Sequence, residues 1–66
     1  MSPTTEIILA GGIQQRVEGD ARDVERAILD ASRGSIMELA WLVDAQTGER
    51  VGVNPAMVIA LRTAGA

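Results

Sequence analysis

The ten residues from Ser35 to Asp44, SIMELAWLVD, limit the fold more than any other stretch of this chain. Positions 37, 39, 41 and 43 are all apolar, and the positions between them are mostly apolar as well. Because neighbouring residues of a strand point to opposite faces, a strand here would be apolar on both faces. Such a strand needs cover on both sides. The pattern therefore predicts a central strand over 35–44, with a helix on one face and a further partner on the other.

The chain is short, with 66 residues. That length predicts a single small domain over 1–66, with flexible ends at 1–5 and 63–66. A domain of this size is marginally stable and usually needs a disulfide, a metal or a partner. The sequence has no Cys and no His, which removes disulfides, thiolate metal sites and the commonest metal ligand. We therefore expect no metal and no cofactor, and a partner takes their place.

The charge of the chain limits the classes of partner. The formal net charge is −3, and all six basic residues are Arg, a usage typical of a GC-rich genome. An acidic chain disfavours nucleic acid and anionic membrane surfaces. No apolar run approaches the roughly 20 residues of a membrane span. The segment MSPTTE also lacks the features of a signal peptide. Together with the absence of Cys, these features predict a cytoplasmic protein.

Two strands are predicted at the N-terminal end, over Glu6–Ala10 and Ile13–Glu18, with a Gly-Gly turn between them. A loop of three residues, with a glycine in the left-handed region, is favoured because register follows the buried face. That loop length brings four apolar residues to one face: Ile7, Leu9, Ile13 and Val17. The opposite face of the second strand should be solvated.

A helix is predicted from Asp20, as its N-cap, to Gly34, as a left-handed C-terminal stop. Its apolar stripe has the i, i+3, i+4, i+7 spacing and consists of Val24, Ala27, Ile28 and Ala31. Two ion pairs are expected on the polar face, Arg22–Glu25 and Arg26–Asp30. Leu29 lies off the stripe and is interpreted either as a half-exposed edge residue or as a partner contact.

The C-terminal half predicts three strands, the first of which is the one over 35–44. A three-residue loop over 46–48, with Gly48 left-handed, would place Val43 opposite Val51 and Trp41 opposite Val53. The fourth strand covers Arg50–Asn54, and Asn54-Pro55 ends it before a tight turn and a last strand over Val58–Arg62. The order β-β-α-β-β-β predicts an α+β fold, an antiparallel sheet with one α-helix packed on a face.

The same landmarks resemble a group of small actinobacterial proteins of uncharacterised function, so an actinobacterial or phage source is expected. The matching segments are Asp20–Gly34, Asp44–Gly48, and Val53-Asn54-Pro55 with the VIALR run. The resemblance covers most of the chain but rests on structural motifs. It implies the fold described above and transfers no catalytic residue.

Catalysis would have few side chains to use. Without His, Cys, Lys or Tyr, only carboxylate chemistry remains. Glu18, Asp20 and Asp23 are interpreted as helix capping and first-turn charge, with a weak divalent-ion site as the alternative. The Gly-Gly pair is interpreted as a hairpin turn and not as a phosphate loop. The six Arg are spread along the chain, which indicates a solvated surface, although a local basic patch stays open. We expect that the chain is not an enzyme.

The composition, 47% apolar, leaves more apolar surface than one helix can cover. Our first hypothesis is a noncatalytic interaction module that self-associates, most simply as a twofold dimer. The contact would centre on Ala40, Leu42 and Ile36, or on Trp41 and its row. The second hypothesis is an adaptor or inhibitor that binds another protein. It would bind through an edge strand at Glu6–Ala10 or Val58–Arg62, or through an apolar face. A small nucleic-acid-binding regulator is the third. The candidate interface residues are Leu29, Ile36, Met37, Leu39, Trp41, Leu42, Val43 and Met57.

Overall fold

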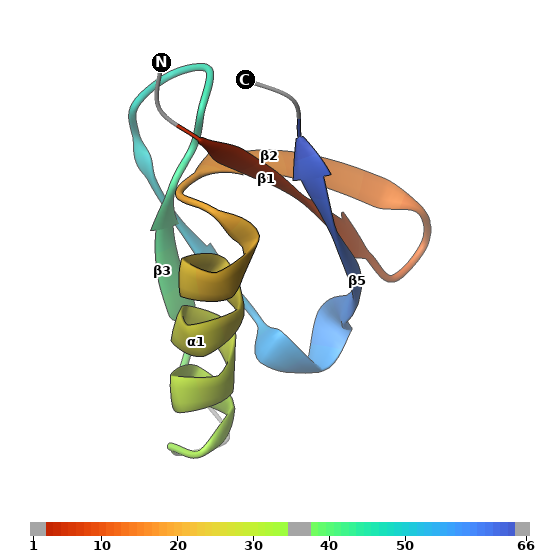
Figure 1. Cartoon of the computed structure of the whole chain (residues 1–66). Helices are drawn as coiled ribbons and strands as arrows, with labels where there is room; N and C mark the ends of the chain where they lie inside the picture. The colour runs from red at the N-terminus through yellow and green to blue at the C-terminus, as the bar shows by residue number, and fades with distance from the viewer. Residues whose placement is uncertain (1–2, 35–37, 65–66) are drawn as a thin grey trace.

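A computed structural model gives the structure, and residues 3–34 and 38–64 are described here. Figure 1 shows the elements in chain order. They are β1 (Thr4–Leu9), β2 (Ile13–Glu18), α1 (Ala21–Ser32), β3 (Ala40–Val43), β4 (Arg50–Val53), the 3₁₀ turn η1 (Pro55–Met57) and β5 (Val58–Ala64). The predicted α+β fold and its order of elements are confirmed. The first strand starts earlier than predicted, at Thr4, and the last strand ends later, at Ala64.

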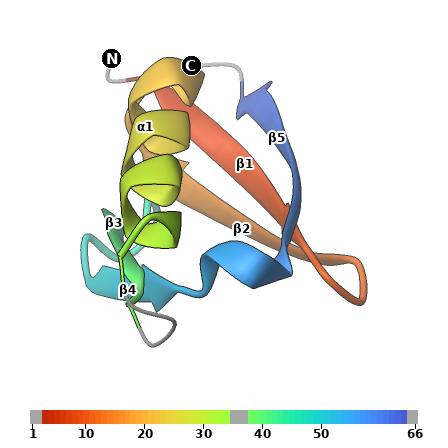
Figure 2. The same ribbon diagram turned by 90° about the horizontal axis from the view of Figure 1, so that it is seen from below.

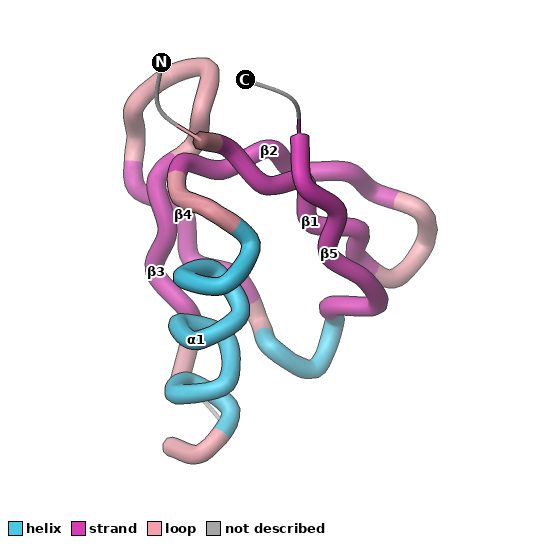
Figure 3. The backbone as a smooth tube through the Cα atoms, in the orientation of Figure 1, coloured by secondary structure: helices cyan, strands magenta, loops and turns pink. Residues whose placement is uncertain are grey.

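The strands form two antiparallel sheets, β2–β1–β5 and β3–β4, as Figure 3 shows. An isolated bridge between Val17 and Asp44 joins them, and the Ala45 N–H donates to the Arg16 carbonyl at 3.0 Å. The prediction of one sheet centred on 35–44 is therefore wrong. Among residues 38–44 of that segment, only Ala40–Val43 form a strand, β3, because its partner β4 is limited to four residues by a loop on one side and Asn54-Pro55 on the other. Residues 35–37 lie outside the described part of the chain.

The first hairpin has the predicted register. Leu9 pairs with Ile13 and Ile7 with Gln15, so the loop contains three residues. Gly11 and Gly12 both have positive φ, 87° and 80°, which only glycine adopts without strain. The residues of β2 on the opposite face, at positions 14, 16 and 18, are exposed. The three-residue loop predicted from the apolar face is therefore confirmed.

The helix begins as predicted and ends differently. The Asp20 side chain accepts a hydrogen bond from the Asp23 N–H at 2.8 Å, which makes Asp20 the N-cap. Gly34, however, does not have positive φ, so the predicted left-handed stop is wrong. The N–H of Gly34 instead reaches the Ala31 carbonyl three residues back, at 3.1 Å. This tightening of the last turn satisfies a free carbonyl without a left-handed residue.

The core lies where α1 packs on β3 and contacts β1 and β5 (Figure 2). The helix contributes most of its predicted stripe, and the two sheets contribute the rest. The members are Ile7, Val17, Val24, Ile28, Ala31, Ala40, Leu42 and Val53. Thr5 is the one buried polar residue among those described. Its hydroxyl donates to the Gly19 carbonyl at 2.9 Å, which removes the cost of burying an unpaired donor.

The second hairpin differs from the prediction by one residue of register. Leu42 pairs with Val51 and Trp41 with Gly52, so neither Val51 nor Val53 is opposite the residue expected. The loop has four residues because Asp44 closes it, with its N–H donating to the Glu49 carbonyl at 2.8 Å. Gly48 has the predicted positive φ, 77°. The even-numbered residues of β3, Ala40 and Leu42, face α1, and the small side chain of Ala40 lets the helix lie close to the strand.

Candidate functional site

The outer face of the β3–β4 hairpin carries the largest exposed side chain, Trp41, which is 56% exposed. Leu39 lies beside it. A Cβ placed on Gly52 would be 2.9 Å from Leu39 Cδ1 and 3.1 Å from Trp41 Cη2. Both side chains therefore lie over the bare backbone of Gly52. A continuous apolar surface of this kind marks a contact site more often than single exposed apolar residues do.

A guanidinium group completes this surface. Arg50 Cζ lies 5.2 Å from the centroid of the Trp41 ring, the distance of a cation–π contact. Val43, which pairs with Arg50, is on the same face of the strand and half-buried. We call this surface the Trp41 face, and it consists of Leu39, Trp41, Val43, Arg50 and Gly52.

The structure separates the other predicted interface residues. Leu42 lies in the core, because it points toward α1, and so does Ala40. Leu29 on α1 and Met57 in η1 are exposed, but they belong to other elements than the β3–β4 hairpin. Ile36 and Met37 lie outside the described residues. Of the two contact centres proposed from the sequence, only the Trp41 row faces outward within the described part.

The sequence did not predict the exposure of two apolar residues. Ile13, at the tip of the first hairpin, is 60% exposed, and Ile59 in β5 is 66% exposed. Ile59 lies where the β1–β5 register shifts, between the pairs Ile8–Ala60 and Leu9–Val58. It is thus the extra residue of a bulge. No pattern in the VIALR run indicates that bulge.

Asp44 lies at the isolated bridge that joins the two sheets. Its carboxylate accepts from the Thr47 hydroxyl at 2.7 Å and from Gln15 Nε2 at 3.0 Å. Gln15 belongs to β2, so this second bond crosses from one sheet to the other. Hydrogen bonds to the charged form, the one from Thr47 above all, lower the pKa of Asp44 below its ordinary value of 3.8.

The stability of the fold should therefore depend on Asp44 at acid pH. Because folding lowers the pKa, the contribution of this carboxylate is complete above the ordinary value and is lost as the pH falls through the lowered pKa. We expect the urea midpoint of the wild type to fall more steeply than that of Asp44→Asn between about pH 5 and about pH 2. Thr47→Val, which removes the strongest donor, should show an intermediate slope. Parallel slopes for the wild type and Asp44→Asn would contradict this role.

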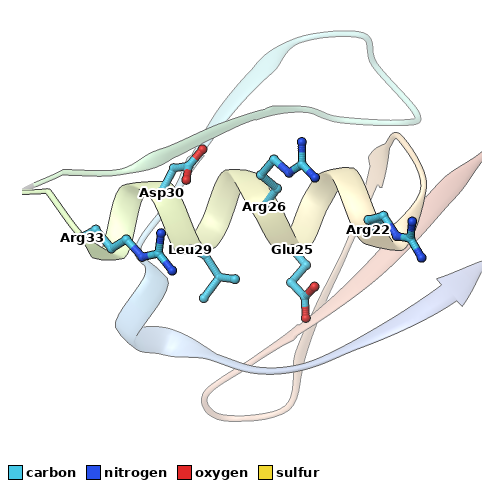
Figure 4. Close-up of a pocket in the computed structure, with 6 residues that line it drawn as sticks. All are labelled: Arg22, Glu25, Arg26, Leu29, Asp30 and Arg33. Carbon is cyan, nitrogen blue, oxygen red and sulfur yellow. The ribbon is translucent and has the colours of Figure 1, made fainter.

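The outer side of α1 carries charges of both signs (Figure 4). A shallow hollow of about 320 Å³ lies along it, lined by Arg22, Glu25, Arg26, Leu29, Asp30 and Arg33. The two predicted ion pairs are absent. The single salt bridge among residues 3–34 and 38–64 joins Arg62 to Glu6 across β5 and β1. The mixed charges give this side of the helix no uniform basic surface.

The remaining candidates from the sequence have structural roles. Asp20 caps α1, and Asp23 supplies the N–H that it binds. Gly11 and Gly12 form the hairpin turn. In the described ranges, no three acidic side chains lie close enough to hold a metal ion.

The strand order decides which edges are open. β1 lies between β2 and β5, so the proposal that Glu6–Ala10 is an edge strand is wrong. β5 has a neighbour on one side only, and the proposed edge at Val58–Arg62 is correct. The order could not be read from the sequence, because β5 pairs with β1 across most of the chain.

No protein-family model, no curated protein and no solved structure matches this chain. No helix within 3–34 and 38–64 has the length and apolar character needed to cross a membrane.

Proposed function

We propose that this protein is a noncatalytic interaction module that self-associates through the Trp41 face. The observation that carries the proposal is the exposure of Trp41 and Leu39 side by side on a hairpin whose other face is already covered by α1. Aromatic residues and Arg are enriched at protein contacts because they bury much area and still make directional bonds. The absence of Cys suits a reducing compartment, and we place the module in the cytoplasm.

A second copy suits this face because a twofold contact places the same patch of each copy against the other. Trp41 and Gly52 are paired at the middle of the face, and Arg50 lies at one end, opposite Val43. Twofold packing about Trp41 and Gly52 brings the two apolar centres together. The five residues of the Trp41 face are few compared with the roughly 20–30 residues per partner of a standard interface. The contact should therefore dissociate on dilution.

Sedimentation and Trp41 fluorescence test this proposal together. At high micromolar concentration we expect a species heavier than the 6.9 kDa chain. The emission of Trp41 should move to longer wavelength on dilution, because the indole becomes solvated as copies separate. Trp41→Ser should give a lighter assembly than the wild type. Ile13→Ser, which removes an equally exposed apolar residue at a distant hairpin tip, is the control and should leave the mass unchanged.

Two results would overturn the proposal. A wild-type chain that stays monomeric at high micromolar concentration would exclude self-association. A Trp41→Ser variant with the mass of the wild type would exclude this face as the contact, even if the chain does associate.

A further inference from the structure

The free edge of β5 is poorly protected against pairing with another strand. Edge strands are usually guarded by Lys, Pro, inward charges or a covering segment, because their free N–H and C=O groups bind any strand that approaches. β5 has seven residues and only one charge, Arg62, which is bound to Glu6 of the neighbouring strand. The bulge at Ile59 protects the start of β5, but nothing in Ala60–Ala64 opposes an added strand.

The register identifies the backbone groups that point outward. The Gly12 N–H donates to the Leu9 carbonyl at 3.0 Å, so Leu9 and every second residue of β1 before it turn toward β2. The residues between them turn toward β5, where their partners are Ala60, Arg62 and Ala64. Leu61 and Thr63 therefore direct their N–H and C=O groups away from β1, to the open edge.

We propose that β5 pairs antiparallel with β5 of a second copy, with Leu61 opposite Leu61 at the twofold axis. Antiparallel hydrogen-bonded pairs must join outward residues to outward residues, and Leu61 meets that condition with its own copy. In this register Arg62 lies opposite Ala60 of the partner. The alternative, centred on Arg62, would place two guanidinium groups directly opposite, which is destabilising. The β5 edge is thus a second self-association site, separate from the Trp41 face.

Two different twofold contacts on one chain extend an assembly beyond a dimer. We therefore expect the wild type at high concentration to contain more than two copies. Thr63→Pro tests the β5 contact, because proline removes an outward N–H and leaves the bonds of Arg62 and Ala64 to β1. Thr63→Val keeps the N–H and is the matched control. We expect Thr63→Pro to form a dimer through the Trp41 face, Trp41→Ser to form a dimer through β5, and the double variant to be a monomer.

Disulfide trapping tests the register, even if Thr63→Pro does not fold. The chain has no Cys, so each introduced thiol is the only one. A mixture of Ala60→Cys and Arg62→Cys chains should form the mixed disulfide on mild oxidation, while either variant alone should not. Cross-linking of Ala60→Cys with itself, in chains that keep Arg62, would overturn the Leu61-centred register.

The two proposals fail in different ways. If Thr63→Pro keeps the wild-type mass and no mixed disulfide forms, the β5 pairing is wrong, and the edge is free for a strand of another protein. If instead Trp41→Ser keeps the wild-type mass while Thr63→Pro lowers it, the Trp41 face is wrong and the β5 pairing holds.

Discussion

Ile7→Ala is expected to remove a large part of the stability of the fold. Ile7 is 0% exposed, at the centre of the middle strand of the first sheet. Removing a buried Ile side chain to Ala costs about 2–5 kcal/mol, because apolar contacts are lost and a cavity remains. A domain of this length has a total stability of about 3–10 kcal/mol. The free energy of unfolding from urea titration, followed by circular dichroism, measures the loss.

Ile13→Ala is the matched control for that substitution. Ile13 is on the same face of the same hairpin, and it is 60% exposed. The same truncation there should change the free energy of unfolding by no more than about 0.5 kcal/mol. Equal effects at positions 7 and 13 would mean that the core does not lie between β1 and α1.

Ala31→Leu is expected to destabilise the fold from the opposite cause, too much volume. Ala31 is 4% exposed in the core, and Ala40 of β3 is 2% exposed. Small side chains at these positions let α1 lie close to the strand. A leucine at position 31 must push the helix away or adopt a strained rotamer, at a cost of about 1–3 kcal/mol. The shift of the thermal midpoint reports this cost.

Ser32→Leu provides the comparison for Ala31→Leu. It introduces the same side chain one residue later, at an exposed position of the helix. Leucine favours helix more than serine does, although the bond from the Ser32 hydroxyl to the Leu29 carbonyl is lost. The midpoint should therefore change little. A stabilising Ala31→Leu would show that the helix and β3 leave unfilled space between them.

Elements defined by local pattern were predictable from the sequence. The stripe of α1 and its cap at Asp20 follow from spacing and from a side chain that binds the backbone three residues later. The first hairpin follows from its Gly-Gly turn and from one apolar face that can be buried in only one register. In each case one local pattern was compatible with a single structure, and no second pattern favoured another.

The second hairpin could not be predicted in the same way, because β3 is apolar on both faces. Parity then gives no preference between Trp41 and Leu42 as the inward residue. The deciding interactions are at Asp44, whose bonds to Thr47 and to Gln15 fix a four-residue loop. The bond to Gln15 joins residues 29 positions apart, and no local pattern contains it.

The strand order could not be predicted from the sequence for a related reason. β5 joins β1 through contacts such as Glu6 with Arg62, which are 56 residues apart in the chain. This pairing makes β1 an interior strand and leaves the edge at β5. The exposure of the candidate surfaces depends on it, so the sequence could supply the candidate residues but not the surfaces that they form.

The absence of a side chain at position 52 has a consequence for how this protein can vary during evolution. The indole of Trp41 and the end of Leu39 occupy the space that a Cβ on Gly52 would need. A methyl group there must displace the end of Leu39 and shift the indole slightly, and a larger group would compete with the indole for the same area. Positions 41 and 52 should therefore not mutate independently. In homologous sequences, a bulky residue at one position would accompany a small residue at the other.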